Sequence, residues 1–514
     1  MQEEYRGLQT GNWLLPVLVA LIGAFMALLD SSIVNVALPT MMRVFNTDTS
    51  TISWVVTGYM LALGVVVPLS GWLGDRLGLK LLYMLSLGIF TLGSLLCAWS
   101  VGVGTMIAAR VIQALGGGML MPTTMSIIYS LVPQDRLGRA MGVFGIALIV
   151  APAIGPTLGG YLVEYVDWRW IFTINLPIGV LGLFLSWFYL PLFPRRDPGP
   201  LDLGGALTSA AGLFCLLLAL SKGNEWGWTS EAVVLLLYTS SVALGLFVYL
   251  ELVTENPLLD LRVFRFPVFS WGNLILIIIS IAMFGGIFYI TFFLQIARGL
   301  GPMETGLITM PAALASGIMM PLAGWLYDRI GPKIPTMLGL LWVAVTTYML
   351  KSLDVDTPTS TIYLLLIMRA MGMPFAMMPA QTAALSVIPP ALIGRASAIT
   401  NIISRVSASF GIALLTSVMN NRMALHAARY REALTWDNLG LQFFFQQADA
   451  LLKIWGQGKL LAQFYLQSLL AKYAFVRAIG DVFIITAGIT LLALVPALFL
   501  YKGEAEGRGP LGWE

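Results

Sequence analysis

Apolar residues fill most of the chain in long runs, and short polar segments separate the runs. A membrane span needs about 20 mostly apolar residues. Backbone polar groups in lipid must be satisfied within a helix or a closed barrel, and these runs are too long for barrel strands. We therefore predict an all-α integral membrane protein with 14 transmembrane helices. The predicted spans lie near residues 13–37, 52–73, 81–101, 104–128, 138–163, 170–191, 203–221, 232–251, 268–295, 304–327, 335–351, 360–384, 395–420 and 479–501.

Lys and Arg residues are distributed unevenly between the loops that join these runs. They gather in the loops on the side of both termini, for example at Arg76, Arg139 and Arg329, and are scarce in the short loops opposite. Cytoplasmic loops carry such an excess of positive residues. We therefore expect both termini in the cytoplasm. The first run is too long for a cleavable signal peptide, so we expect it to be retained as a span.

One sizeable polar segment, 421–478, interrupts the pattern on the outer side. It mixes charged residues with apolar runs at 439–445 and 460–470. This mixture predicts two amphipathic helices lying on the outer face of the membrane. The segment is then a surface connector, a gate, or a docking surface for a membrane-fusion-type adaptor protein.

Composition narrows the class of protein further. The chain is 58% hydrophobic and only 11% charged, which excludes an ordinary soluble domain. A net charge of +3 without a basic tract gives no indication of nucleic-acid binding. Cys97, Cys215 and the single His426 form no metal or disulfide pattern. The phosphate-binding loop of ATPases is also missing, so we expect no enzyme activity and no cofactor.

Two short sequence patterns recur in the two halves of the chain. Residues 71–80 are GWLGDRLGLK, and residues 324–333 are GWLYDRIGPK. A second pair begins with RVIQALGGGMLMP at Arg110 and RAMGMPFAMMP at Arg369. Two equivalent halves are typical of transporters built from parallel repeats.

The repeated motif resembles the signature of the major facilitator superfamily. Two further runs, APAIGPTLGG at 151–160 and WRWIFTINLPIG at 168–179, are similar to those of the fourteen-span drug:proton antiporters of the EmrB/QacA type, as is the stretch from Leu29 to Pro39. The resemblance implies a major facilitator fold in the cytoplasmic (inner) membrane of a bacterium. It also implies two six-helix halves, 1–200 and 256–514, the second including the outer loop 421–478, with two additional spans in 201–255.

The repeated motif predicts a conformational latch between the halves on the cytoplasmic side. A carboxylate at Asp75 suits the N-terminus of another helix, and Arg76 and Lys80 suit acids across the interface between the halves. Positive charges that only fix the topology are the alternative. The predicted latch residues are Gly71, Asp75, Arg76, Gly78, Lys80, Asp328, Arg329 and Lys333.

The antiporter motif of the fifth span combines helix-kinking prolines with glycines that allow close helix packing. Its residues are Pro152, Gly155, Pro156, Gly159 and Gly160. The resemblance implies that this helix seals against the other half and limits leakage. Generic packing of small residues is the alternative.

Four ionisable residues lie inside apolar runs: Asp30, Arg110, Arg369 and Arg405. Such residues are costly in a membrane and are functional by default. Burial disfavours the charged form of Asp30, which suits a group that exchanges protons, and Arg110 belongs to a motif that can join the same network. We therefore predict that Asp30 and Arg110 couple transport to protons; a structural hydrogen bond is the alternative. For Arg369 and Arg405, fixed pairing and coupling stay equally open.

The substrate pocket of a repeat transporter lies between the halves near the midplane. Amphipathic or cationic substrates favour aromatic and methionine walls. The pocket candidates are Met26, Asn35, Trp54, Tyr59, Phe144, Phe288, Phe292 and Gln381.

The sequence thus predicts proton-driven efflux of small amphipathic compounds, drugs or toxic metabolites, by alternating access. The proton gradient is the expected energy source, and protons, membrane lipid and the substrate are the expected partners. One alternative is a proton-coupled importer of a small nutrient on the same fold, against which the 151–160 motif argues. A non-transporting membrane scaffold is the other, and the repeated latch argues against it.

Overall fold

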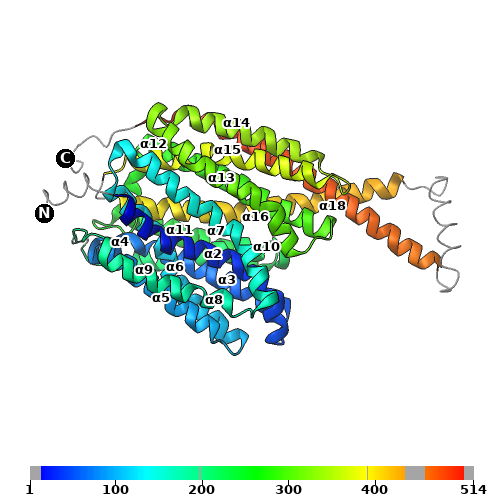
Figure 1. The fold of residues 1–514 in the computed structure, drawn as a ribbon, viewed down its shortest axis with the longest axis horizontal. Coiled ribbons are helices and arrows are strands. Elements are labelled where there is room, and N and C mark those ends of the chain that lie inside the picture. Colours follow the sequence, from blue (N-terminus) through cyan, green and yellow to red (C-terminus); the bar gives the residue numbers. More distant parts are fainter. Residues whose placement is uncertain (1–12, 196, 198, 390–391, 434–457, 503–514) are drawn as a thin grey trace.

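The computed structural model describes residues 13–195, 197, 199–389, 392–433 and 458–502. These residues form helices and contain no strand, as the apolar runs predict. Figure 1 shows the long helices running side by side along the long axis of the molecule. The first eight helices are α2 (Leu14–Val44), α3 (Thr49–Val66), α4 (Leu69–Leu77), α5 (Leu79–Ala98), α6 (Val103–Leu131), α7 (Leu137–Tyr165), α8 (Trp170–Thr173) and α9 (Asn175–Tyr189).

A pair of helices follows, and then a second large set. The pair consists of α10 (Leu203–Trp226) and α11 (Glu231–Val253). The second set comprises α12 (Pro267–Phe292), α13 (Pro302–Ile330), α14 (Lys333–Met349), α15 (Thr359–Ser386), α16 (Ile393–Ala433), α18 (Gly458–Leu492) and α19 (Leu494–Ala497). Short 3₁₀ turns lie at Gln134–Arg136, Leu261–Arg265 and Leu350–Ser352, and a π turn at Phe293–Ala297 ends α12.

The number of membrane-crossing elements agrees with the sequence. Among the described residues, 13 helices are long and apolar enough to span a bilayer, and the bent pair α3 and α4 makes a fourteenth span. That pair bends by 56° near Pro68, which has no amide hydrogen to continue the helix. The prediction of 14 spans is confirmed.

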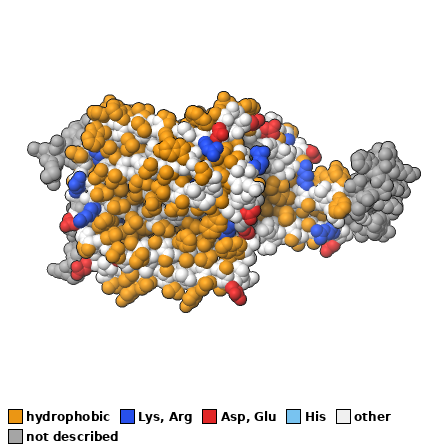
Figure 2. Space-filling view, turned by 90° about the horizontal axis from the view of Figure 1, so that it is seen from below, with side chains coloured by type: hydrophobic (Ala, Val, Ile, Leu, Met, Phe, Trp, Pro, Cys, Tyr) orange, Lys and Arg blue, Asp and Glu red, His pale blue; other side chains and the backbone are white. Residues whose placement is uncertain are grey.

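The outer surface of the bundle is apolar where lipid would contact it. Figure 2 shows one face covered by hydrophobic side chains, with charged side chains gathered toward the ends. Helix α11 has only 17% of its most apolar stretch buried within the protein. An apolar surface of this extent needs a membrane as its solvent.

The helices pack as two groups with α10 and α11 beside them. Helices α2–α9 pack on one another and form the N-terminal group, and α12–α19 form the C-terminal group. Helix α10 contacts both groups: Lys222 Nζ donates to Ser53 Oγ of α3 at 3.3 Å, and Asn224 Nδ2 donates to the Ala413 carbonyl of α16 at 3.2 Å. The domain boundaries expected at residues 200 and 255 stay predictions.

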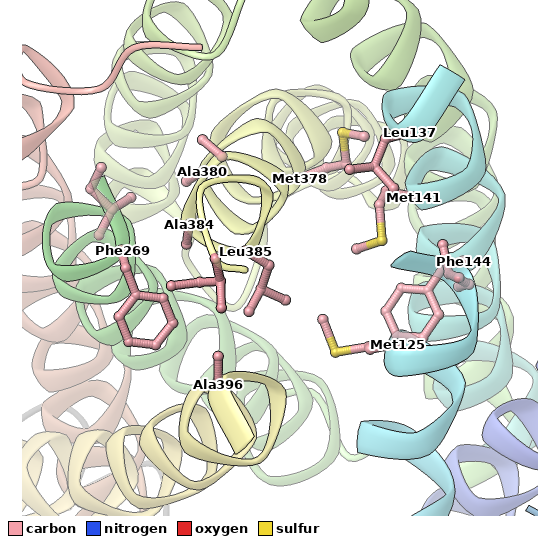
Figure 3. Close-up of a cluster of buried hydrophobic side chains, with 14 of the residues drawn as sticks. Met125, Leu137, Met141, Phe144, Phe269, Met378, Ala380, Ala384, Leu385 and Ala396 are labelled. Carbon is pink, nitrogen blue, oxygen red and sulfur yellow. The ribbon is translucent and has the colours of Figure 1, made fainter. Parts of the chain in front are cut away.

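The two groups share a core at only one end of the bundle. We call the end that carries residues 71–80 and 324–333 the motif end, and the opposite end the far end. Near the motif end, a single cluster contains Met125, Met141 and Phe144 of the N-terminal group and Met378 and Leu385 of the C-terminal group. Figure 3 shows Met141 of α7 facing Met378 of α15.

At the far end, the two largest buried clusters belong to one group each. One contains Tyr289 and Phe483 of the C-terminal group, and another contains Val34 and Trp168 of the N-terminal group. Helices α7 and α13 stay in contact here as well, because a Cβ on Gly306 would lie 2.9 Å from Thr157 Oγ1. The contacts between the two groups form what we call the seam, which is therefore more complete at the motif end.

The structure corrects the expectation for segment 421–478. Its first part continues α16 to Ala433, and its last part belongs to α18, which begins at Gly458. Figure 1 shows both helices extending past the rest of the bundle along its long axis instead of lying across the end. The apolar run at 439–445 lies outside the described residues. Arg422 and His426 of α16 contact Asp481 of α18, at 3.7 and 2.9 Å, which helps to hold the two extensions together.

Candidate functional site

Asp30 and Arg110 form a buried ion pair in the middle of the N-terminal group. The Arg110 Nη1 atom lies 2.5 Å from Asp30 Oδ2, and the two side chains are 1% and 0% exposed. Asp30 lies halfway along the apolar helix α2, and Arg110 lies in α6. Burying two charges is costly, and only good geometry with further hydrogen bonds compensates for it.

Amide side chains supply the further hydrogen bonds. Gln113 Nε2 donates to Asp30 Oδ1 at 2.9 Å, and Asn175 Nδ2 of α9 donates to the same oxygen at 3.1 Å. Both amides also donate to Ser94 Oγ of α5, at 2.7 and 3.2 Å. An ionised carboxylate can only accept hydrogen bonds, so the three donors around Asp30 match its charged form. The network joins four helices of one group.

Tyr59 forms one wall of this network. The Arg110 guanidinium carbon lies 3.8 Å from the centroid of the Tyr59 ring, a close cation–π contact. Arg110 Nε also donates to the Val55 carbonyl at 3.3 Å. The Tyr59 hydroxyl is buried and has no hydrogen-bond partner among the described residues. An unpaired buried hydroxyl is unusual and needs an explanation.

At the motif end, the acid of each repeated motif lies against a helix start in the other group. Asp328 of α13 accepts hydrogen bonds from the Gly138 and Arg139 amides, at 2.9 and 3.2 Å, in the first turn of α7. Asp75 of α4 lies 3.9 Å from Arg395 Nε, in the first turn of α16. A negative charge at a helix N-terminus is stabilised by the helix dipole. The two acids thus occupy equivalent places in the two repeats, but Asp328 accepts from backbone amides while Asp75 faces an arginine side chain.

The basic residues of the motif differ from the prediction that they pair across the seam. Arg76 pairs with the exposed Asp197, at 3.6 Å, and Lys80 donates to the Trp187 carbonyl at 2.7 Å. Arg329 lies over the ring of Trp325 in its own helix, 4.4 Å from the centroid, and Lys333 is exposed at the start of α14. These side chains reach outward because long basic residues at helix ends extend toward water. The acids and glycines make the cross-group contacts.

Glycines bring the helices of the seam into backbone contact. A Cβ on Gly71 would lie 3.2 Å from Arg395 Cα, and a Cβ on Gly324 would collide with the Gly138 carbonyl. Gly78 has another role, because its φ of 83° ends α4 in a conformation that favours glycine. Small residues therefore set the distance between the two groups.

The antiporter motif in α7 faces two directions. A Cβ on Gly155 or Gly159 would meet Ser32 or Ile33 of α2, and Ser32 Oγ donates to the Pro152 carbonyl at 2.8 Å. These three motif residues therefore pack α7 within its own group. Pro156 and Gly160 face the other group: a Cβ on Gly160 would lie 3.7 Å from Met303 of α13, and one on Gly306 would lie 3.4 Å from Pro156. The expectation that the motif seals against the other half thus applies to only part of it.

The pocket candidates do not gather in one place. Met26 is fully buried among Phe90 and Leu120 inside the N-terminal group, which corrects its assignment to a pocket between the halves. Phe144 lies on the seam near Met125 (Figure 3), and Gln381 Nε2 approaches Met125 Sδ across it at 4.0 Å. Tyr59 belongs to the polar network.

The other candidates are more accessible and lie toward the far end. Asn35 is exposed and donates to the Ser31 carbonyl at 3.1 Å. Trp54 is half-buried against a cluster that joins α3 and α10 and contacts Val406 of α16. The rings of Phe288 and Phe292 are also half-buried, with centroids 4.4 Å apart.

Sequence reasoning missed the amides that complete the network. Gln113 lies in the span-four motif and Asn175 in the WRWIFTINLPIG run, so each is a polar residue inside an apolar stretch. That isolation was the available signal. Their common partner, Asp30, is evident only once four helices are packed together.

A buried charge network inside a many-helix membrane bundle, with two helix groups and a seam, is the architecture of a membrane transporter. The family model described as "Major Facilitator Superfamily" matches residues 20–412, and the chain belongs to this family.

Relatives and solved structures agree with this assignment. The Bacillus subtilis protein YhcA, an uncharacterized MFS-type transporter, is 34% identical, covering 94% of this chain and 92% of its own. A Mycobacterium tuberculosis protein named as a multidrug resistance protein B homolog is 32% identical, covering 95% and 90%. The proton:xylose symporter XylE superposes with a TM-score of 0.60 at 15% identity, covering 95% of both chains, and shows the fold alone.

Proposed function

We propose that this transporter is a proton-driven exporter of small amphipathic compounds, drugs or toxic metabolites, across the cytoplasmic membrane. The observation that carries the proposal is the Asp30–Arg110 ion pair, fully buried among membrane helices and surrounded by hydrogen-bond donors. A buried charge that is so costly to keep is expected to serve function. The name of the M. tuberculosis relative, a multidrug resistance protein, supports export as the direction.

In the proposed mechanism, Asp30 exchanges one proton per cycle with each side of the membrane. Protonation removes the charge that holds Arg110 and turns one oxygen of Asp30 into a donor that no longer matches Gln113 and Asn175. The network then rearranges, and the α2 and α6 helices that carry it move relative to each other. The proton gradient supplies the energy, and no cofactor takes part.

The proposed cycle alternates access by opening one end of the seam at a time. The shared core and the contacts of Asp75 and Asp328 at the motif end support a state in which that end is closed. Separate cores at the far end support an opening there. We place both termini and the motif end in the cytoplasm. The far-end extensions of α16 and α18 then stand outside and offer a docking surface for an adaptor protein.

The test is proton-driven dye uptake into inverted membrane vesicles from exporter-deficient cells that produce the protein. An imposed gradient, acidic inside, should concentrate an amphipathic dye within the vesicles, and a protonophore should abolish this uptake. Uptake that survives the protonophore would contradict proton coupling. Accumulation only with the opposite gradient orientation would favour import instead.

A further inference from the structure

The ionisable groups inside the membrane helices are unbalanced in charge. Asp30 neutralises Arg110, but Arg369 and Arg405 have no carboxylate partner among the described residues. Arg369 is satisfied by neutral acceptors instead, donating to Thr347 Oγ1 and the Ala282 carbonyl, each at 3.0 Å. Arg405 differs, because it makes no hydrogen bond or ion pair with any described residue, and its Nε–H is fully buried.

Arg405 lies on the seam and not inside one helix group. It belongs to α16 of the C-terminal group and follows Asn401 by one helical turn, and the Asn401 amide approaches Met125 Sδ of α6 in the N-terminal group at 3.5 Å. The next residue, Val406, packs against the cluster of Leu61 and Leu217. Residues four apart lie on one face of a helix, so Arg405, like Asn401, is on the side of α16 that faces the N-terminal group.

Arg405 is half-buried, and a guanidinium without a partner is costly to keep at such a position in a membrane helix. Its natural complement is an oxygen anion, because the planar guanidinium can bind a carboxylate with two parallel hydrogen bonds. The described residues on either side of the seam supply no such group to Arg405. A ligand that enters the seam would supply it.

We propose that the substrate is a small amphipathic organic anion, whose acidic group pairs with Arg405 at the seam, where α16 faces the N-terminal group. This inference rests on the proposed export function and names its substrate class. It replaces the cationic substrate expected from the aromatic residues. The apolar part of the ligand would lie against Trp54 and its neighbours, which are half-buried on the same side.

The test uses two dyes that share one ring system and carry opposite charge, fluorescein as the anion and rhodamine 123 as the cation. Binding of each to the purified full chain is measured by fluorescence anisotropy. The wild-type protein should bind fluorescein more tightly. Arg405→Gln should weaken fluorescein binding roughly tenfold or more, the loss expected for a charge-assisted hydrogen bond, and leave rhodamine 123 within about twofold.

Two further variants separate charge from geometry and from general effects. Arg405→Lys keeps the charge but not the planar fork, so its fluorescein affinity should fall between those of wild type and Arg405→Gln. Arg43→Gln removes an exposed arginine at the far end of α2 and should change neither dye. Retained rhodamine 123 binding shows that a variant is folded.

Several results would overturn the proposal. Tighter wild-type binding of rhodamine 123, or unchanged fluorescein binding in Arg405→Gln, would show that Arg405 does not form an anion site. An equal loss of both dyes would make Arg405 a structural residue. Transport is measured separately in inverted vesicles: Arg405-dependent fluorescein binding without uphill transport of either dye would contradict the export function and leave the anion site standing.

Discussion

At the residue scale, the Asp30 carboxylate is the central group of the site, because it has both a structural role and a proposed role in proton exchange. It accepts from Arg110, Gln113 and Asn175, so it organises the interior of the N-terminal group. It is also the residue to which we assign the proton. Any substitution therefore affects stability and transport together, and an experiment must separate the two.

We predict that Asp30→Asn lowers both the thermal stability and the uphill transport of the protein. Removing one partner of a buried ion pair leaves the other charge uncompensated, at a cost of about 3–5 kcal/mol. The double variant Asp30→Asn/Arg110→Gln removes both charges and should recover much of the stability. It should still fail to concentrate dye in inverted vesicles, because neither side chain then titrates in the working range.

Thermal unfolding in detergent and gradient-driven uptake are the two measurements. Wild-type uptake by the folded double variant would show that the coupling proton resides elsewhere. Glu231→Gln, an exposed acid at the start of α11, serves as the control and should alter neither quantity.

The residues of this site were only partly predictable. Asp30 and Arg110 were evident because a charge inside an apolar run is conspicuous in any single sequence. Gln113 and Asn175 were isolated polar residues too, but their common partner lies on another helix, so their role was not evident. The misplaced Met26 has the same cause, since the apolar runs specify the helices but not the direction in which each side chain points.

At the element scale, the repeated motif acts through helix starts. Asp328 contacts the first turn of α7, and Asp75 contacts Arg395 in the first turn of α16, so each repeat touches the opposite group. The sequence predicted that the acid of the motif contacts a helix N-terminus, because the same acid recurs in both repeats; the latch itself stays a prediction. The sequence was wrong about the basic residues, since their long side chains reach water as easily as they reach an acid.

We predict that Asp328→Asn opens the motif end in a larger fraction of molecules. The substitution removes the charge from two hydrogen bonds with backbone amides, and each loss of about 1.4 kcal/mol shifts the ratio of closed to open molecules tenfold. Spin labels at Lys80→Cys and Lys333→Cys, in a background without Cys97 and Cys215, report the separation of the two groups. The distance distribution should move toward longer values.

The matched control is Asp197→Asn, which removes an equally short acid from an exposed pair with Arg76. Exposed ion pairs contribute little, so the distances should stay as in the parent protein. If the two variants give the same distribution, the contacts of Asp328 do not hold the motif end closed.

At the scale of the whole molecule, the two helix groups are connected on two sides. Helices α7 and α13 contact each other from Gly138 to Gly160, and α10 joins α3 to α16 on its own side. The number of the spans was predictable from hydropathy alone. The place of α10 and α11 was not, because nothing in their apolar sequences specifies a neighbour.

We predict the topology of the whole chain from the positions of its ends. Helix α2 begins and α19 finishes at the motif end, as Figure 1 shows, and the basic loops there lead us to expect that end in the cytoplasm. Arg429→Cys, exposed on the extension of α16, should react with a membrane-impermeant maleimide in intact cells. Lys333→Cys should react only in inverted vesicles. The reverse pattern of labelling would invert the proposed direction of transport.

The length of α16 has a mechanical consequence. Its 41 residues make a rod of about 60 Å, twice the roughly 30 Å of the hydrocarbon layer. Arg395 lies at the start of this helix against Asp75, and Arg405 lies at the seam. Arg422 and His426 contact α18 beyond the bundle. A rod of this length that tilts by about 10° about its base moves its tip by about 10 Å. A protein bound to the tip of α16 would therefore be displaced whenever the transport cycle tilts this helix.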